Sequence, residues 1–337
     1  MVRSFRKKNR KGKIVGITIA VVILAALLIN VIILPLTAEK SRVKELRTDF
    51  DNAYINANKT DVSAHRAGGG EAPEETLSAF KLCMENGEYK VDILEFDLHI
   101  TKDGELILLH DDTLDRTSDA VEVFGKKKNK ASDYTYEEIY ALNMGENFVS
   151  PSGETPYKGL RGEAVPEEVR VLSLDKILTY LEKGVRPDGT LKYIIEIKDS
   201  DEKGEKAMDK LYEKMVEYNI LDRTIVGTFH GDVSKYIDKK YGDKVTRSAG
   251  IAEVLGFYMS FLYGAKLGEV NYKVLQIPYK AFVWNLGTKA FIDYAHKYNI
   301  AVQYWTINDA DDVKTLVKNG ADAIMTDYPS MAYNEIN

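Results

Sequence analysis

The sequence predicts an α/β fold, on three observations. Strand-like segments alternate with helix-like segments along most of the 337 residues, which favours an α/β sheet or barrel. The chain is 45% hydrophobic and 29% charged, as is typical of a folded globular protein. Without a short N-terminal segment, the remaining length suits one α/β barrel or two ordinary domains.

The N-terminus has the charge pattern of a membrane anchor. Residues 1–13 contain seven Lys and Arg and no acid, and the 23 residues 14–36 contain no charged residue. At ~1.5 Å rise per residue, that length crosses a hydrocarbon layer of about 30 Å. We therefore expect a cytoplasmic tail at 1–13, a single transmembrane helix at 14–36, and an extracellular domain held at the cell membrane. A cleaved signal peptide is the alternative, but its apolar region usually spans only about 7–15 residues.

The charge balance argues against one class of partner. Removing the seven basic residues of the tail leaves 39 Lys and Arg against 52 Asp and Glu, a net charge of −13. Nucleic-acid binding needs a basic surface, so no nucleic-acid partner is expected. The basic tail is better explained as a topology signal.

The expected elements follow the anchor in order. Residues 37–60 are predicted to be a linker, a polar helical stalk over 38–60, and 61–337 the main domain. We expect strands at 61–65, 91–98, 105–110, 192–197, 224–229, 244–249, 273–277, 300–306 and 322–326. We expect helices at 74–86, 173–183, 203–219, 231–240, 251–265, 287–299 and 309–319. Residues 115–170, rich in Gly, Pro, Lys, Asp and Tyr, are predicted to be an insertion over one face, either a determinant of selectivity or a structural flap.

Alternation within ILEFDLHI, residues 93–100, places polar groups on one face of a strand. Glu95, Asp97 and His99 point one way and the apolar residues the other, because successive side chains of a strand alternate. The two acids then lie about 6.5 Å apart along the strand. Carboxylates this close repel unless a cation or a basic group lies between them, so a Mg²⁺ or Ca²⁺ site competes with a solvated or salt-bridged face.

A turn and a third acid extend this pattern. TKDG at 101–104 predicts a hairpin, and closure about its midpoint would place Glu95 opposite His110. Glu196 lies within the apolar strand YIIEIK and shares a face with Lys198. Burying such an acid is unfavourable without a partner. The two residues could pair with each other, or hold a cation and an anion side by side.

A glycine-rich turn precedes the first helix, in HRAGGGEAPEET at 65–76. The glycines let the backbone approach a ligand closely, and Arg66 offers a guanidinium suited to phosphate oxygens. The segment matches neither a Walker loop nor a dinucleotide fingerprint.

Five blocks occur in order between residues 63 and 330: HRAGGGEAPEET, EFDLHITKDGELILLHDDTLDRTS, EIK, WTIN and GADAIMTDYP. With these blocks the chain resembles the glycerophosphodiester phosphodiesterase family. The resemblance implies a (β/α)8 barrel of the triosephosphate isomerase type. It also implies metal-dependent hydrolysis of a small-molecule or headgroup phosphodiester to glycerol 3-phosphate and an alcohol.

The resemblance also implies roles for individual residues. His65 and His110 match the general acid and base, and Asp111 a group that supports His110. Glu95, Asp97 and Glu196 match the acids that hold one divalent cation, Mg²⁺ or Ca²⁺. Arg66 and Lys198 match positions that contact the phosphate, and Trp305 an aromatic residue near the alcohol moiety.

Two positions depart from the family pattern. Ala67 stands where the family usually has glycine, and Glu75 where it usually has asparagine. The acid at position 75 would add negative charge near the site. Neither departure removes a proposed catalytic group.

Two other functions use the same residues. A phospholipase-type phosphodiesterase acting on intact lipid would be favoured by an apolar insertion. A non-catalytic barrel that binds phospholipid headgroups would be signalled by the loss of a histidine or a metal-binding acid, and none is lost.

Overall fold

The protein is described here by a computed structural model that covers residues 28–43, 47–56, 59–281 and 284–337. Its strands are β1 (Asp61–Ala64), β2 (Ile93–Ile100), β3 (Leu106–Leu108), β4 (Lys192–Ile197), β5 (Thr224–Gly227), β6 (Val274–Pro278), β7 (Lys280–Ala281), β8 (Trp284–Asn285), β9 (Ala301–Trp305) and β10 (Ala323–Thr326). Its α-helices are α2 (Leu34–Ser41), α3 (Leu77–Glu85), α4 (Ala120–Val123), α5 (Tyr136–Tyr140), α6 (Leu174–Leu178), α7 (Asp201–Glu217), α8 (Gly231–Lys240), α9 (Ile251–Tyr263), α10 (Lys289–Lys297), α11 (Ala310–Asn319) and α12 (Pro329–Ile336). Short 3₁₀ or π segments include η1 (Ile29–Ile33), η2 (His65–Ala67) and η6 (Thr179–Val185).

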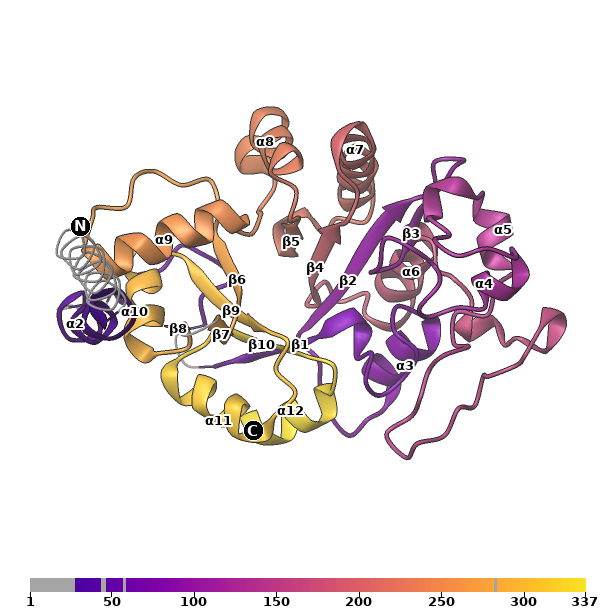
Figure 1. Cartoon of the computed structure of the whole chain (residues 1–337), viewed down its shortest axis with the longest axis horizontal. Coiled ribbons are helices and arrows are strands. Elements are labelled where there is room, and N and C mark those ends of the chain that lie inside the picture. The colour runs from indigo at the N-terminus through magenta and orange to yellow at the C-terminus, as the bar shows by residue number, and fades with distance from the viewer. Residues whose placement is uncertain (1–27, 44–46, 57–58, 282–283) are drawn as a thin grey trace, which may run out of the picture.

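Parallel strands form a barrel with helices around it (Figure 1). The order is β5-β4-β2-β1-β10-β9-β6, with β3 antiparallel to β2. Residues 247–248 bridge Val226 and Val274, which links the two end strands of this order. The predicted α/β barrel is therefore confirmed. The strand expected at 244–249 is reduced to these two bridges, and α12 and the β7–β8 hairpin were not predicted.

Strand β2 is buried on both faces, as a strand of a parallel barrel should be. Leu94, Phe96 and Leu98 pack in the hydrophobic layer beneath the helices. Glu95 and Asp97 line a cavity on the opposite face. The predicted separation of apolar and acidic faces is therefore confirmed.

The predicted hairpin register is wrong by one residue. Leu98 pairs with Leu108 and Ile100 with Leu106, so paired positions sum to 206. Thr101 N–H donates to the Glu105 carbonyl at 2.9 Å, and the loop between them has three residues rather than a four-residue turn. The antiparallel pairing spans only Leu98–Ile100 on β2. Glu95 and His110 therefore do not face each other across the hairpin.

The segment before the barrel is not a helical stalk throughout. Helix α2 ends at Ser41, and residues 47–56 contain no helix. Asn52 Nδ2 donates to the carbonyls of Lys273 and Asn299 at 2.8 and 3.0 Å. Tyr54 is buried among apolar residues inside the barrel, at the amino ends of its strands. Burial of these groups holds the segment in a non-helical path with a turn at 52–55, against its moderate helix propensity.

Most of the predicted transmembrane segment, 14–36, lies outside the described residues. Only 28–36 are described, and they belong largely to η1 and α2. Within the described ranges, no helix combines the length and apolar character needed to cross a membrane.

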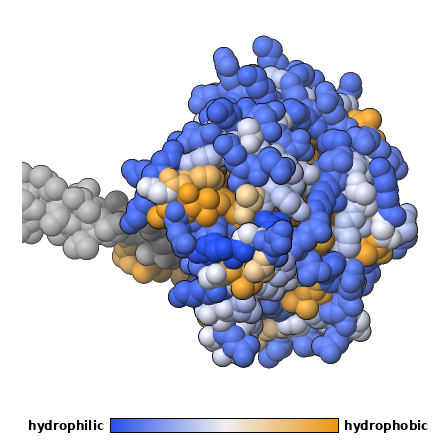
Figure 2. Space-filling view, turned by 90° about the vertical axis from the view of Figure 1, so that its right-hand side faces the viewer, coloured by the Kyte–Doolittle hydropathy of each residue, from blue (hydrophilic) through white to orange (hydrophobic). Residues whose placement is uncertain are grey.

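The segment between β3 and β4 forms the predicted insertion at one end of the molecule (Figure 1). It contains α4 and α5 and buries a small core of its own that includes Leu114, Ile139 and Leu142. Figure 2 shows this end of the molecule to be mainly hydrophilic, with separate hydrophobic patches. On the face seen in Figure 2, the insertion therefore offers no broad apolar surface.

Candidate active site

One cavity of about 130 Å³ brings together the eight residues predicted to carry catalysis, hold the cation or bind the substrate. These are His65, Arg66, Glu95, Asp97, His110, Glu196, Lys198 and Trp305. They come from or follow β1, β2, β3, β4 and β9. Active sites of such barrels lie at the carboxyl ends of the strands, where loops can vary without disturbing the core.

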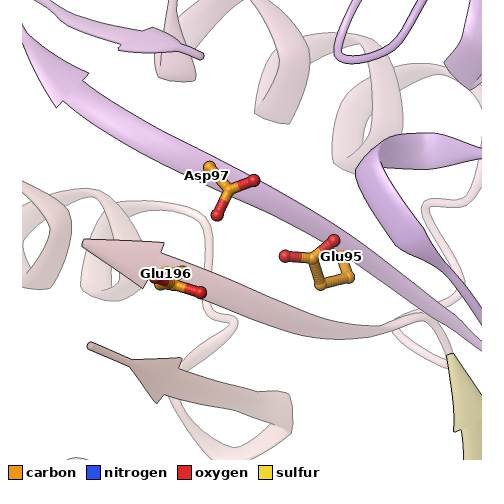
Figure 3. A group of neighbouring side chains, drawn as sticks. All are labelled: Glu95, Asp97 and Glu196. Carbon is orange, nitrogen blue, oxygen red and sulfur yellow. The ribbon is translucent and has the colours of Figure 1, made fainter. Parts of the chain in front are cut away.

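Three carboxylates converge from two neighbouring strands (Figure 3). Glu95 and Asp97 project from β2, and Glu196 projects from β4, where it is paired in register with Asp97. One oxygen from each lies within 4.8 Å of the others. Burial and the charge of Asp97 raise the pKa of both Glu95 and Glu196. The raised pKa values indicate crowded negative charge that a cation would relieve.

Asp97 is the least satisfied of the three acids. Its side chain is 1% exposed, and within the described part of the chain neither carboxylate oxygen accepts a hydrogen bond. The nearest cationic groups are Lys198 Nζ at 3.5 Å and Arg66 Nε at 3.9 Å. A buried carboxylate is unfavourable without partners, so the position is suited to a ligand.

Lys198 lies between two of the acids. Its Nζ is 2.9 Å from Glu196 Oε1, the ion pair considered from the sequence. It also lies 5.9 Å from the ring centroid of Phe229, which packs edge-on against Trp305. The cavity thus has charged side chains on one side and the rings of Phe229 and Trp305 on another. Such a cavity suits a ligand that combines a charged group with an organic substituent.

His65 is held by a carboxylate from the far end of the chain. Its Nδ1 lies 2.6 Å from Asp327 Oδ1, and Asp327 Oδ2 accepts from Asn308 Nδ2 at 2.7 Å. Burial lowers the pKa of His65, but the hydrogen bond to Asp327 and the charge of Glu95 outweigh burial and raise it. His65 is therefore stabilised in its protonated form, with Nε2 as the remaining donor.

His110 has the opposite tendency. Its Nδ1 lies 2.8 Å from Asp111 Oδ1, and Arg116 Nε donates to Asp111 Oδ2 at 2.6 Å. Burial lowers the pKa of His110, and the nearby charges of Arg66 and Lys198 lower it further, against the opposing effects of Asp97 and Asp111. His110 is therefore stabilised in its neutral form, with Nε2 free to accept a proton.

The backbone after β1 adopts an uncommon conformation that serves the carboxylates. Arg66 and Ala67 have φ of 49° and 58°, in the left-handed region. The turn directs the Arg66 backbone N–H at Glu95 Oε2, at 2.7 Å. Glycine adopts this region without strain, so Ala67 occupies a position whose backbone suits the family's glycine.

Glu75, the second departure, also has a left-handed φ of 57°, which asparagine adopts more readily than glutamate. Its Oε1 accepts the Asp97 backbone N–H at 2.7 Å. Burial and the charge of Asp97 raise the pKa of Glu75 well above its usual value. Glu75 therefore favours the neutral acid, which carries no charge, like the asparagine expected at this position from the resemblance.

Several residues of the site were not predicted. Asp327 and Asn308 lie in two of the quoted blocks, but no local pattern indicated that they would meet His65. Gln276, Ser248 and Phe229 also line the cavity. The available signal was their position in the chain alone: Gln276 lies within β6, Ser248 forms a bridge to β6, and Phe229, Asn308 and Asp327 follow barrel strands.

Known proteins resemble the chain in sequence and in fold. Residues 65–331 match the family model described as the glycerophosphoryl diester phosphodiesterase family. The chain is 29% identical over 279 residues to a glycerophosphodiester phosphodiesterase of Caldanaerobacter subterraneus subsp. tengcongensis, covering 82% of this chain and 97% of that protein. It is 25% identical over 277 residues to one of Bacillus altitudinis, with 81% and 96% covered.

Two solved structures share the fold. A glycerophosphodiester phosphodiesterase from Agrobacterium tumefaciens superposes with a TM-score of 0.59 at 20% identity, covering 82% of this chain and 99% of that one. An Oleispira antarctica phosphodiesterase in complex with the product sn-glycerol-3-phosphate superposes with a TM-score of 0.59 at 18% identity, covering 82% and 97%. At these identities the likeness shows the fold.

Proposed function

The chain belongs to the glycerophosphoryl diester phosphodiesterase family, and we propose that it hydrolyses glycerophosphodiesters to glycerol 3-phosphate and an alcohol with the help of one divalent cation. Family membership makes it a phosphoric diester hydrolase. The observation that carries the proposal is the cavity in which three carboxylates and two oppositely tuned histidines meet. The relative that binds sn-glycerol-3-phosphate supports the substrate class.

The donor set fits a hard cation such as Mg²⁺ or Ca²⁺. Glu95, Asp97 and Glu196 would hold it, and the two oxygens of Asp97 that accept no hydrogen bond from the described residues support this assignment. A bound divalent cation supplies charge neutralisation to a phosphodiester.

The protein's own groups divide the proton transfers between them. His110, neutral and oriented by Asp111, accepts the proton of the attacking hydroxyl at Nε2. His65, protonated and oriented by Asp327, donates the Nε2 proton to the leaving alkoxide. Groups tuned in opposite directions suit the two halves of such a reaction. The attacking hydroxyl belongs to water, which gives glycerol 3-phosphate directly, or to the glycerol beside the phosphate, which gives a cyclic phosphate that water then opens to glycerol 3-phosphate.

The remaining cavity residues bind the substrate. Arg66 and Lys198 offer positive charge to the phosphate oxygens. Trp305 and Phe229 form the aromatic wall against which the alcohol packs. The left-handed turn after β1 keeps Glu95 in place through the Arg66 N–H.

Release of glycerol 3-phosphate from glycerophosphocholine by the full chain in detergent tests this function. We expect release with Mg²⁺ or Ca²⁺ and none with a chelator. His65→Gln and His110→Gln should each lower the rate by about 10²–10⁴-fold. Lys235→Gln, at an exposed position of α8 outside the cavity, serves as the matched control. A folded chain that releases nothing with either cation would argue against glycerophosphodiesters as substrates.

A lipid-directed function finds less support. A phospholipase-type function was expected to have an apolar insertion, whereas the face of the insertion seen in Figure 2 is mainly hydrophilic. A purely binding role leaves the two histidines and their carboxylate partners without a purpose.

The barrel is also proposed to lie outside the cell, held at the membrane by residues 14–36 with the N-terminus in the cytoplasm. The support is the uncharged stretch behind seven basic residues. Alkaline extraction of membranes, followed by proteolysis from outside, measures both parts of this proposal.

A further inference from the structure

We propose that the outer face of helix α9 lies on the lipid bilayer as a second membrane contact. The exposed residues of α9 are Ile251, Ala252, Leu255, Gly256, Met259 and Tyr263, and none is charged. The four large ones are 63%, 55%, 41% and 48% exposed, in chain order. Positions four residues apart share one side of a helix, so these side chains form a continuous apolar stripe.

The single charged residue of α9 does not interrupt the stripe. Glu253 is paired with the buried Arg247 at 2.7 Å and accepts the Gly250 N–H at 2.8 Å. Both contacts hold the Glu253 carboxylate toward the barrel, although its side chain is 35% exposed. The most exposed positions of α9 are therefore all uncharged, and the one partly exposed acid is already paired.

The neighbouring helix α8 has the pattern expected of a helix that faces water. Its exposed positions include Asp232, Lys235, Lys239 and Lys240. Helices α8 and α9 follow consecutively around the same barrel, so their difference is not a property of the fold. A contiguous apolar patch of this kind marks an interaction surface.

The N-terminal residues identify the bilayer as the occupant. Segments η1 and α2 pack on the carboxyl-terminal half of α9, where Arg42 donates to the carbonyls of Phe261 and Leu262 at 2.7 and 2.6 Å. The Tyr263 hydroxyl also donates to Asn30 Oδ1. The segment that contacts Tyr263 adds further exposed apolar side chains at this end of α9: Leu28, Ile29, Ile32, Ile33 and Leu36.

The length of the preceding chain completes the argument, which rests on the membrane anchoring proposed above. Residues 14–27 contain no charge and lead directly into the residues that contact α9. If residues 14–36 span the bilayer, residues 30–36 lie near its outer surface. The end of α9 that packs on them must then lie at the same depth. Apolar faces of surface-bound helices enter the headgroup boundary by about 5–10 Å.

This contact determines how the active site is presented. Helices of a βα barrel run alongside its strands, so α9 lying on the bilayer turns the barrel axis along the membrane surface. Helix α9 begins beside Ser248 and Ala249, which line the cavity. The cavity then opens along the membrane rather than into it, and the insertion points away from α2 and α9 (Figure 1). The orientation favours water-borne or surface-tethered phosphodiesters over buried lipid.

Depth measurements on the full chain test the proposal. Leu255→Cys and Met259→Cys on α9, and Lys235→Cys on α8 as the control, each provide an exposed thiol for a fluorescent label. The native Cys83 is buried and serves as the unlabelled background. The protein is reconstituted in vesicles of phosphatidylcholine and phosphatidylglycerol that carry nitroxide-labelled lipid. We expect quenching at 255 and 259 to exceed that at 235 by about threefold or more.

The outcomes separate this inference from the anchor and from the enzymatic function. Vesicle flotation reports the anchor, and glycerol 3-phosphate release in detergent reports folding and activity. Equal quenching at the three positions in vesicle-bound protein would overturn the contact at α9 and leave the anchor standing. Protein that does not float would overturn both. Bismaleimide cross-linking of Leu255→Cys into dimers at low protein density would assign the stripe to a second copy instead.

Discussion

Asp97 and Asp322 are two buried aspartates in the same barrel, 1% and 0% exposed. They differ in the hydrogen bonds that their carboxylates accept. Asp322, just before β10, accepts the Asn56 N–H at 2.8 Å, the Val302 N–H at 2.7 Å and a bond from His296 Nε2 at 2.9 Å. Neither carboxylate oxygen of Asp97 accepts a hydrogen bond from the described residues. At the amino ends of the strands, called here the closed end, the Asp322 carboxylate has a full set of hydrogen-bond donors. At the carboxyl ends, called here the open end, the cavity leaves the Asp97 carboxylate free to bind a ligand.

The contrast shows how one fold separates stability from function. A buried charge with a full set of partners ties segments together, and at the closed end Asp322 joins the N-terminal segment to β9 and α10. A buried charge without partners destabilises the protein unless a ligand supplies what is missing. Such a position is retained for what it binds.

Exchanging each aspartate for asparagine should produce opposite results, and this is the largest expected effect. Asp97→Asn should lower kcat/KM by about 10³-fold, because it weakens a cation site worth several kcal/mol to the transition state. The free energy of unfolding should stay the same or rise, since one of three crowded charges is removed. Rate measurements and urea unfolding on the same samples supply both quantities.

Asp322→Asn should lower the free energy of unfolding by about 3 kcal/mol, because it breaks a buried pair with His296. Its kcat/KM per folded molecule should match that of the unchanged chain. If Asp97→Asn unfolds the protein and Asp322→Asn inactivates it without loss of stability, the division between the two ends is wrong.

Cation binding should distinguish Asp97→Asn from Asp322→Asn by its effect on the free energy of unfolding, without any rate measurement. At a free Mg²⁺ or Ca²⁺ concentration about 100 times its Kd, the folded state gains about 2.7 kcal/mol. The gain should disappear in Asp97→Asn and persist in Asp322→Asn. Thermal unfolding with the cation and with a chelator measures it, and an equal gain in the two variants would place the cation elsewhere.

The active site was more predictable than the closed end because its pattern is local. Glu95 and Asp97 share a face through strand alternation, and Glu196 follows the same rule on β4. The bounds of β4 and α8 were predicted as the structure has them. These predictions depend only on residues a few positions apart, and a single sequence is enough to show such local patterns.

Long-range partners could not be predicted in this way. Asp322 and His296 are 26 residues apart, and no local pattern indicates that they meet. Tyr54 was assigned to a polar stalk, although it fills the closed end of the barrel. The hairpin register failed because a three-residue loop and a four-residue turn share the same residue types and differ by one position in pairing.

The two histidines allow the smallest and most specific test, since their pKa values are shifted in opposite directions. His110 must be neutral to accept a proton, so kcat/KM should rise with pH through its lowered pKa. His65 must be protonated to donate one, so kcat/KM should fall as pH rises through its raised pKa. The profile should therefore be bell-shaped, with its two limbs on either side of the usual histidine pKa.

Removing the carboxylate that contacts one histidine, Asp327 for His65 or Asp111 for His110, should shift only one limb of the pH profile of kcat/KM. Asp327→Asn removes a group that raises the pKa of His65, so the alkaline limb should move to lower pH, with kcat/KM at the optimum lowered about tenfold. Asp111→Asn removes a group that raises the pKa of His110, so the acidic limb should move to lower pH instead. If Asp327→Asn moves the acidic limb, the two histidines have the reverse roles. If neither limb moves, the histidines do not carry the protons, and the open end of the barrel is a binding site rather than a catalytic one.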